Sequence, residues 1–181
     1  MFKHILLISF VLLFSHCSKF NVLSNVKVEF SSTTTVEGKS IGESIGADFL
    51  GELGFSNFNQ FDISSSQTFK DEIGDVSRVE YVNLETFTLS VTDNTQDLGF
   101  FSSVDFYISI DGESEVLIAS SDDFTMSPKS VSLIVDKTID LTPYIKSQNI
   151  KIRSDVSLER PDEDTEIRAD LLFLVDAKVI K

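Results

Sequence analysis

The chain has 181 residues, of which 29 are acidic and 15 are basic, and its formal net charge is −14. Such a chain is a poor partner for nucleic acid, because affinity there comes from cations that neutralise phosphates. An anionic lipid surface would also repel it, so we expect membrane attachment only through a covalent lipid.

The N-terminal segment has the pattern of an export signal. Lys3 supplies a positive charge, residues 5–14 form an apolar run interrupted only by Ser9, and Cys17 follows just before the chain turns polar. The run is too short for a transmembrane helix, which needs about 20 apolar residues. We therefore expect residues 1–16 to be a signal peptide.

Cys17 at this boundary resembles the acceptor cysteine of bacterial lipoproteins, and the resemblance covers residues 1–18. The usual motif has an aliphatic residue three positions before the cysteine and a small residue directly before it, where this chain has Phe14 and His16. The resemblance implies that the Cys17 thiol carries lipid such as palmitate and becomes the new N-terminus. The alternative is ordinary cleavage after Cys17, which gives a secreted protein.

The predicted anchor has consequences for location. A lipidated chain is expected at the bacterial cell envelope, with the membrane as its partner through the lipid on Cys17. Ser18 is not the aspartate that holds some lipoproteins at the inner membrane, which favours the outer membrane. Residues 17–25 are expected to form a short tether, and residues 26–181 a single domain held close to the bilayer.

The predicted domain lacks the side chains that most hydrolases need. The two histidines, His4 and His16, lie in the signal segment, and Cys17 is the only cysteine. This excludes thiolate or imidazole zinc sites, disulfides and nucleophile–histidine triads from the domain. We expect no cofactor and no enzyme activity, and a glycosidase built from carboxylates alone is the weakest alternative.

Two motif matches near the start of the domain are attributed to chance. Residues 42–46 fit the G-x-S-x-G nucleophile elbow, but the domain has no histidine to act as its base. Gly38-Lys39-Ser40 is similar to the end of a phosphate-binding loop, but Thr33 stands where its leading glycine is required.

Two-residue alternation of apolar and polar side chains dominates the domain and is typical of half-buried strands. It occurs around Val26–Phe30 and over Val79–Thr92, Val104–Ile110, Val131–Val135, Asn149–Glu159 and Glu166–Ile180. Turn-forming residues separate these segments. The pattern predicts an all-β fold, a single antiparallel β-sandwich of about seven to nine strands with one or two short helices.

Finer features accompany these strands. The phase of alternation over Val79–Thr92 slips near Glu85 and Thr86, which indicates a β-bulge. Short helices are expected at Ser66–Ile73 and Leu141–Ser147, each behind a capping residue. We expect the last two strands to form an antiparallel hairpin joined by residues 161–164.

Five of the eight glycines fall within Gly38–Gly54, interleaved with large apolar residues. We interpret this region as a long loop folded over one end of the sandwich, with its aromatic residues inserted into the core. The alternative is an apolar binding mouth. The candidate ligand-binding residues in and after this loop are Phe49, Phe55, Phe58 and Phe61.

Other candidate sites depend on acidic turns and on one tyrosine. Asp162, Asp164 and Glu166 offer hard oxygen ligands for calcium, but their spacing fits no defined calcium loop, and a solvated turn is the competing interpretation. Tyr107 falls on the outward face of its predicted strand and is a candidate binding residue or a cross-strand packing partner.

These features favour a membrane-anchored lipoprotein with a non-enzymatic binding or structural role at the cell envelope. Its partner is expected to be an unidentified envelope protein or glycan. The alternative is a carrier of an apolar or lipid-like ligand, with the region from Gly38 to Phe61 as its mouth.

Overall fold

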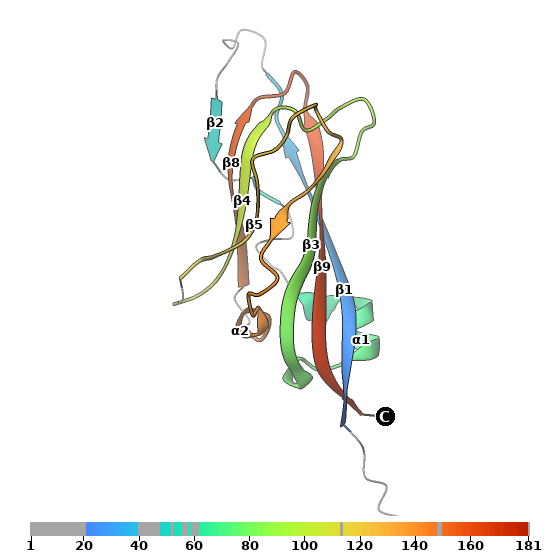
Figure 1. Ribbon diagram of the computed structural model, residues 1–181. Coiled ribbons are helices and arrows are strands. Elements are labelled where there is room, and N and C mark those ends of the chain that lie inside the picture. Colours follow the sequence, from blue (N-terminus) through green and yellow to red (C-terminus); the bar gives the residue numbers. More distant parts are fainter. Residues whose placement is uncertain are drawn as a thin grey trace, which may run out of the picture.

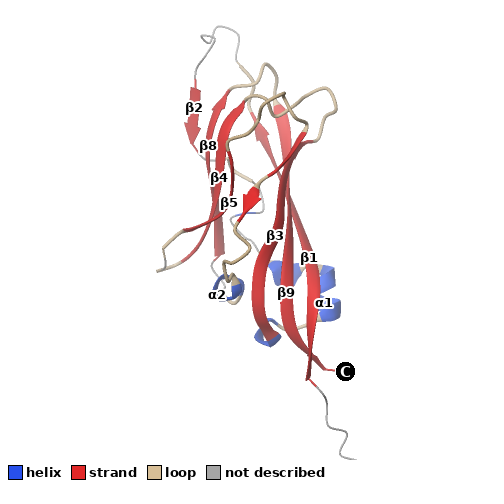
Figure 2. Cartoon of the chain, viewed as in Figure 1, coloured by secondary structure: helices blue, strands red, loops and turns tan. Residues whose placement is uncertain are grey.

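Nine strands, arranged in two antiparallel sheets that face each other, make up most of the described chain (Figures 1 and 2). The computed structural model describes residues 21–39, 48–51, 53–55, 58, 62–112, 114–147 and 150–180. Their alternating sequence leaves each strand one apolar face, and both sets of apolar faces are buried against each other. The predicted all-β sandwich is confirmed.

The first sheet has four strands and the second has five. The order in the first is β1 (Asn21–Val36), β9 (Thr165–Ile180), β3 (Val79–Val91) and β6 (Ser130–Ser132). The order in the second is β2 (Asp48–Gly51), β8 (Ile150–Glu159), β4 (Phe101–Ile110), β5 (Val116–Ser121) and β7 (Ile134–Val135).

The chain passes repeatedly from one sheet to the other, so that strands consecutive in sequence are seldom neighbours. Every connection from β1 to β4 crosses between the sheets, and so does the connection from β8 to β9. Without the two-residue β7, the orders β1-β9-β3-β6 and β2-β8-β4-β5 are those of a jelly roll, a sandwich of two interleaved Greek keys.

Phenylalanine side chains fill the middle of the core. Phe87 from the first sheet and Phe106 from the second lie with ring centroids 4.3 Å apart. Phe58 packs edge-on against both rings, and Phe55 stacks on Phe58 at 4.7 Å. All four side chains are almost fully buried, so they join the two sheets into one core.

The predicted strands and bulge agree with the structure in detail. On β9 the odd-numbered residues from Ile167 to Ala177 are all buried. The register between β3 and β9 shifts between Leu84 and Thr86, where the sequence predicts the bulge. The extra residue returns Phe87 and Leu89 to the buried face.

Both predicted helices are present, and each is short. Helix α1 (Gln67–Glu72) begins after Ser66, whose hydroxyl accepts a hydrogen bond from the Phe69 amide. Helix α2 (Thr142–Ile145) follows Asp140, whose carboxylate accepts from the Thr142 amide at 2.9 Å. Short 3₁₀ turns occupy Ile63–Ser65 and Val76–Arg78. None of the helices within the described ranges has the length and apolar character to cross a membrane.

Two predicted connections are wrong. Strands β8 and β9 do not pair with each other, because the loop of residues 161–164 carries the chain from one sheet to the other. The segment Val131–Val135 is not one strand, since β6 pairs with β3 and β7 pairs with β5. Alternation shows that a strand has one buried face, but both sheets bury that face in the same core, so the pattern cannot assign a neighbour.

Two boundaries also differ from those expected. Strand β1 begins at Asn21, within the segment predicted as a tether, because residues 21–25 continue the ladder with β9. Part of the predicted glycine-rich loop is the strand β2, which pairs with the end of β8.

Candidate functional site

A polar cleft of about 580 Å³ is lined by residues of the loops between β3 and β4 and between β8 and β9. These loops lie at the upper end of the sandwich in Figure 1. The walls of the cleft are formed by Lys39, which lies just after β1, by the loop between β3 and β4, and by the loop between β8 and β9. The lining residues are Lys39, Thr95, Gln96, Asp97, Gly99, Phe100, Glu159, Arg160, Pro161, Asp162, Glu163 and Thr165.

Hydrogen bonds that involve the backbone fix these walls relative to one another. The Gly38 amide donates to the Asp164 carboxylate at 2.8 Å, and the Lys39 amide donates to the carbonyl of Pro161 at 2.9 Å. On the other side, the Gln96 side-chain amide donates to the carbonyl of Asp164 at 3.1 Å. The β8–β9 loop is therefore held between the other two segments, and the cleft is formed before any ligand arrives.

Glycine is required where β1 meets this loop. A Cβ atom on Gly38 would lie 2.6 Å from the backbone carbonyl carbon of Glu163 and 2.8 Å from the amide nitrogen of Asp164. No side chain fits in that space, since the obstructing atoms belong to the backbone. On the opposite wall, a Cβ on Gly99 would meet the side chains of Ser127 and Asp97.

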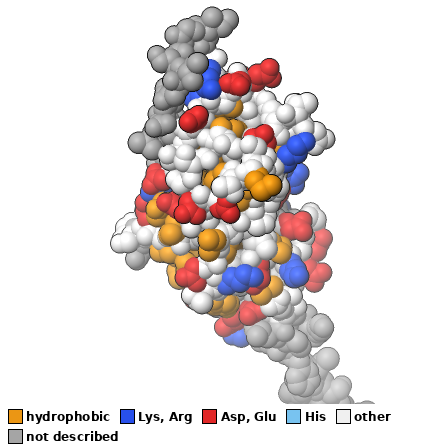
Figure 3. All heavy atoms as spheres, turned by 45° about the horizontal axis from the view of Figure 1, so that its top comes forward, with side chains coloured by type: hydrophobic (Ala, Val, Ile, Leu, Met, Phe, Trp, Pro, Cys, Tyr) orange, Lys and Arg blue, Asp and Glu red, His pale blue; other side chains and the backbone are white. Residues whose placement is uncertain are grey.

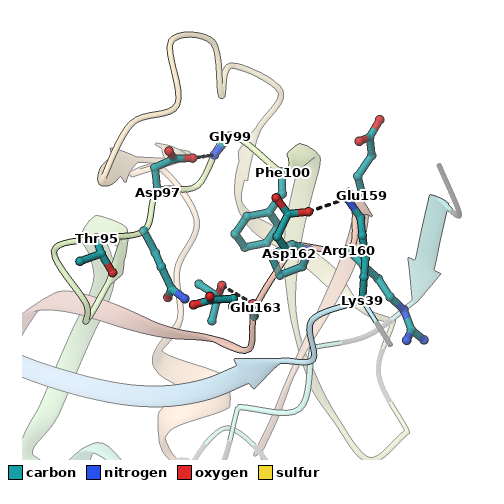
Figure 4. A pocket seen from close by; sticks show the side chains of 12 residues that line it. Lys39, Thr95, Asp97, Gly99, Phe100, Glu159, Arg160, Asp162 and Glu163 are labelled. Atoms are coloured by element: carbon teal, nitrogen blue, oxygen red, sulfur yellow. Dashed lines mark hydrogen bonds and ion pairs between the residues drawn. The ribbon is translucent and has the colours of Figure 1, made fainter. Parts of the chain in front are cut away.

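The cleft carries more negative than positive charge. Its lining has the carboxylates of Asp97, Glu159, Asp162 and Glu163, and the cations of Lys39 and Arg160. The Lys39 ammonium lies 3.1 Å from a carboxylate oxygen of Asp162 (Figure 4). The Asp162 side chain is 91% exposed, so this ion pair is well solvated and contributes little to stability.

The side chains in Figure 4 approach the cleft from three directions. Lys39 and Asp162 meet near Phe100, Asp97 lies on the wall opposite Glu159, and the Asp97 carboxylate accepts from the Gly99 amide at 2.8 Å. Phe100 is half-buried and stacks on Phe101, with ring centroids 4.7 Å apart. The cleft therefore combines charged groups, an amide and one aromatic ring.

The edge of the cleft at Thr95 is stabilised by a charged turn. The Asp93 carboxylate accepts hydrogen bonds from the backbone amide and the hydroxyl of Thr95, both at 2.8 Å. These bonds favour the charged form and hold the pKa of Asp93 below its ordinary value.

The three carboxylates considered as calcium ligands each interact with a different residue of the protein. Asp162 pairs with Lys39, Asp164 accepts from the Gly38 amide, and Glu166 accepts from the Thr92 hydroxyl at 2.7 Å. In the ranges that the structure describes, no group of three or more acidic, histidine or cysteine side chains is placed to share a metal ion.

The aromatic candidates from the glycine-rich region have mixed outcomes. Phe55 and Phe58 are each 2% exposed and belong to the core, in agreement with the interpretation that these aromatics insert into it. Phe49 lies in β2, but its side chain is outside the described part, as are Phe61 and Cys17.

Tyr107 lies on the outer face of its sheet, as predicted. The Arg153 guanidinium stacks over its ring at 4.7 Å from the centroid, and the two residues are paired across β4 and β8. Arg153 also forms a two-point ion pair with Glu115, at 3.0 and 2.8 Å. Tyr107 is thus a cross-strand packing partner, and it is not among the residues that line the cleft.

Sequence reasoning missed the cleft itself. Its residues come from positions near 39, 97 and 160, and each turn separately reads as solvated loop. Gly38 and Gly99 are the signals that were available, since a glycine next to a strand can mark a close approach of another segment.

Comparison with known proteins gives no relative in sequence: no family model and no curated protein matches the chain. Among solved structures, the BFDV capsid protein in its 60-mer form matches with a TM-score of 0.40 and 10% identity, over 88% of this chain and 95% of that one. Its decameric form matches with a TM-score of 0.39 and 7% identity, over 87% and 100%. At these values the likeness carries no argument about function.

Proposed function

We propose that this chain is an exported protein, anchored at the bacterial cell envelope through lipid on Cys17, which binds a ligand in the cleft at the far end of its sandwich. The role is binding rather than catalysis. The observation that carries the proposal is the position of the cleft relative to the start of β1.

The start of β1, which the proposed anchor would precede, and the cleft lie at opposite ends of the first sheet. Asn21 pairs with Ile180 at one end of the first sheet, and Val36 pairs with Thr165 at the other, next to the cleft. Strand β1 has 16 residues, so it spans about 50 Å at 3.3 Å per residue. Cys17 precedes Asn21 by only four positions, a reach of at most about 14 Å.

These lengths imply an orientation of the anchored domain relative to the membrane. A lipid on Cys17 would hold the lower end of the sandwich in Figure 1 close to the bilayer, and the cleft would face away from it. The net charge of −14 supports attachment through the lipid alone, because an anionic membrane surface would repel the chain. A site on the outward end suits an envelope protein or glycan as partner, at the outer membrane by preference.

The alternative functions receive less support from the site. A carrier of an apolar ligand needs an apolar cavity, but Phe55 and Phe58 fill the core, and the cleft is lined by charged residues. A glycosidase needs a general acid shielded from water, but three of the four carboxylates that line the cleft, Glu159, Asp162 and Glu163, are exposed.

Detergent partitioning in the native host tests the anchor. We expect the full-length protein to fractionate with membranes and to enter the detergent phase, and a Cys17→Ala variant to lose both properties. Ser18→Ala is the matched control, because it leaves the acceptor cysteine in place. A wild-type protein that stays in the aqueous phase would overturn the anchored role and leave a secreted one.

A further inference from the structure

The cleft offers both hydrogen-bond donors and hydrogen-bond acceptors, a combination that suits a ligand with hydroxyl groups better than a ligand with one charged group. Carboxylates of Asp97, Glu159 and Glu163 accept hydrogen bonds, and the Lys39 ammonium and the Gln96 amide donate them. A hydroxyl does both, so a ligand with several hydroxyls satisfies both kinds of group. An aliphatic ligand would instead remove them from water without replacement partners, which is costly.

The aromatic ring in the cleft wall adds an apolar face. Phe100 lines the cleft, and it is held in position by its stacking on Phe101 and by the Glu159 amide, which donates to the Phe100 carbonyl at 2.8 Å. A fixed ring among polar groups suits a flat ligand that has hydrocarbon faces and a polar edge. The ring of a sugar has that combination, with C–H groups on its faces and hydroxyls around its edge.

Charge in the cleft selects among ligands of this type. Four carboxylates against two cations disfavour an acidic polysaccharide. The position for a ligand cation beside Asp162 is already taken by the protein's own Lys39, at 3.1 Å. Acidic and basic side chains are both present on the end of the molecule seen in Figure 3, and the acidic ones are the more widespread.

The walls are rigid enough to bind without a large ordering cost. The bonds from Gly38 to Asp164, from Lys39 to Pro161 and from Gln96 to Asp164 are made within the protein alone. The volume, about 580 Å³, is within the usual range for sites that take small molecules or short segments of a polymer.

We infer that the cleft binds a neutral oligosaccharide, with Phe100 against the face of a sugar ring and the surrounding carboxylates and donors on its hydroxyls. This inference names the ligand class for the site on which the proposed function rests. The sugar would belong to a glycan reached from the outward end of the anchored domain.

Nuclear magnetic resonance of the mature protein, purified in detergent from its native host, tests this inference. The probes are maltotetraose, cellotetraose, xylotetraose and chitotetraose, each titrated to about 10 mM, the range of weak binding. We expect at least one to shift the amide resonances of Lys39, Gln96 and Phe100. Phe100→Ala should weaken that binding about tenfold or more. The matched control is Tyr107→Ala, which removes an aromatic ring from the outer face of a sheet and should leave binding unchanged.

A second variant and a second probe keep the outcome unambiguous. Phe100→Leu retains apolar bulk in the wall without the ring, so it should fold and still bind more weakly than the wild type. Tetralysine should leave the cleft resonances unchanged. The inference would be overturned by any of three results. These are no resonance shifts with any of the four sugars, sugar binding by the Phe100 variants that equals that of the wild type, or resonance shifts with tetralysine alone. The anchor is read separately by detergent partitioning, so either idea can fail without the other.

Discussion

The Gly38 amide donates to the Asp164 carboxylate across 126 positions of sequence, and the two residues join the end of β1 to the loop between the sheets. This bond requires the backbone of Gly38 to approach Glu163 so closely that no side chain fits between them. The cleft at the outward end of the molecule depends on that approach, and its integrity can be tested by substitution.

We predict that Gly38→Ala destabilises the protein by about 1–3 kcal/mol, because the new methyl group meets backbone atoms that cannot move independently. The free energy of unfolding from denaturant titration measures the effect. Gly54→Ala is the control, since a Cβ there meets no heavy atom within 4 Å, and it should change stability by less than about 0.5 kcal/mol. Equal stabilities for the two variants would contradict the clamped geometry of the cleft.

Adjacent residues on β4 should differ sharply in their contribution to stability. Phe106 is fully buried and packs against Phe87 and Phe58, so Phe106→Ala should cost about 3–5 kcal/mol. Tyr107 points outward and stacks under Arg153, so Tyr107→Ala should cost much less. Thermal and chemical unfolding of both variants measures the difference. A larger loss for Tyr107→Ala would mean that the inward face of β4 is wrongly assigned.

A buried hydroxyl supports the edge of β3. Thr142 is 8% exposed, and its hydroxyl accepts a hydrogen bond from the Val82 amide at 3.0 Å. Val82 lies on the part of β3 that β6 does not reach. Thr142→Val keeps the shape but leaves that amide without an acceptor, so we expect a loss of about 1–3 kcal/mol. Thr142→Ser should retain most of the stability. Hydrogen exchange at the Val82 amide gives an independent measure, and unchanged protection in Thr142→Val would refute the role.

Acid should weaken a set of aspartate turns. Four aspartates accept hydrogen bonds from the serine or threonine two residues later in the sequence, and these bonds hold the pKa of each carboxyl below its ordinary value. The pairs are Asp75 with Ser77, Asp93 with Thr95, Asp123 with Thr125, and Asp136 with Thr138. A pKa that is lower in the folded state means that this stabilisation is present above about pH 4 and is lost as the pH falls through the folded values.

The Asp136→Asn variant isolates one of these turns. Asparagine makes similar bonds without the charge, so the variant should be less stable than the wild type at pH 7. The difference should narrow as the pH falls below about 4, because the wild-type carboxyl becomes neutral as well. Unfolding curves at several pH values measure the difference, and one that is constant with pH would show that the charge at Asp136 is irrelevant.

The sequence was sufficient for features that depend on neighbouring residues. Alternation located the strands, and the phase slip near Glu85 located the bulge, because both are local consequences of which side chains face the core. Ser66 marked the start of α1 through its capping bond.

Features that depend on distant segments were out of reach. The loop of residues 161–164 looks like a hairpin turn, but it crosses between sheets, because β8 pairs with β2 and β4 while β9 pairs with β1 and β3. The cleft could not be predicted for the same reason, since its walls come from three parts of the chain that are distant in sequence and are brought together by the jelly-roll topology.

The most direct test of the proposed function is the intact mass of the mature protein isolated from its native host. An N-terminus at Cys17 with a mass increment the size of a diacylglycerol group, absent in Cys17→Ala, is the result that we predict. An unmodified N-terminus beyond Cys17 would contradict the anchored role. The cleft would then belong to a freely secreted domain, without a fixed direction relative to any membrane.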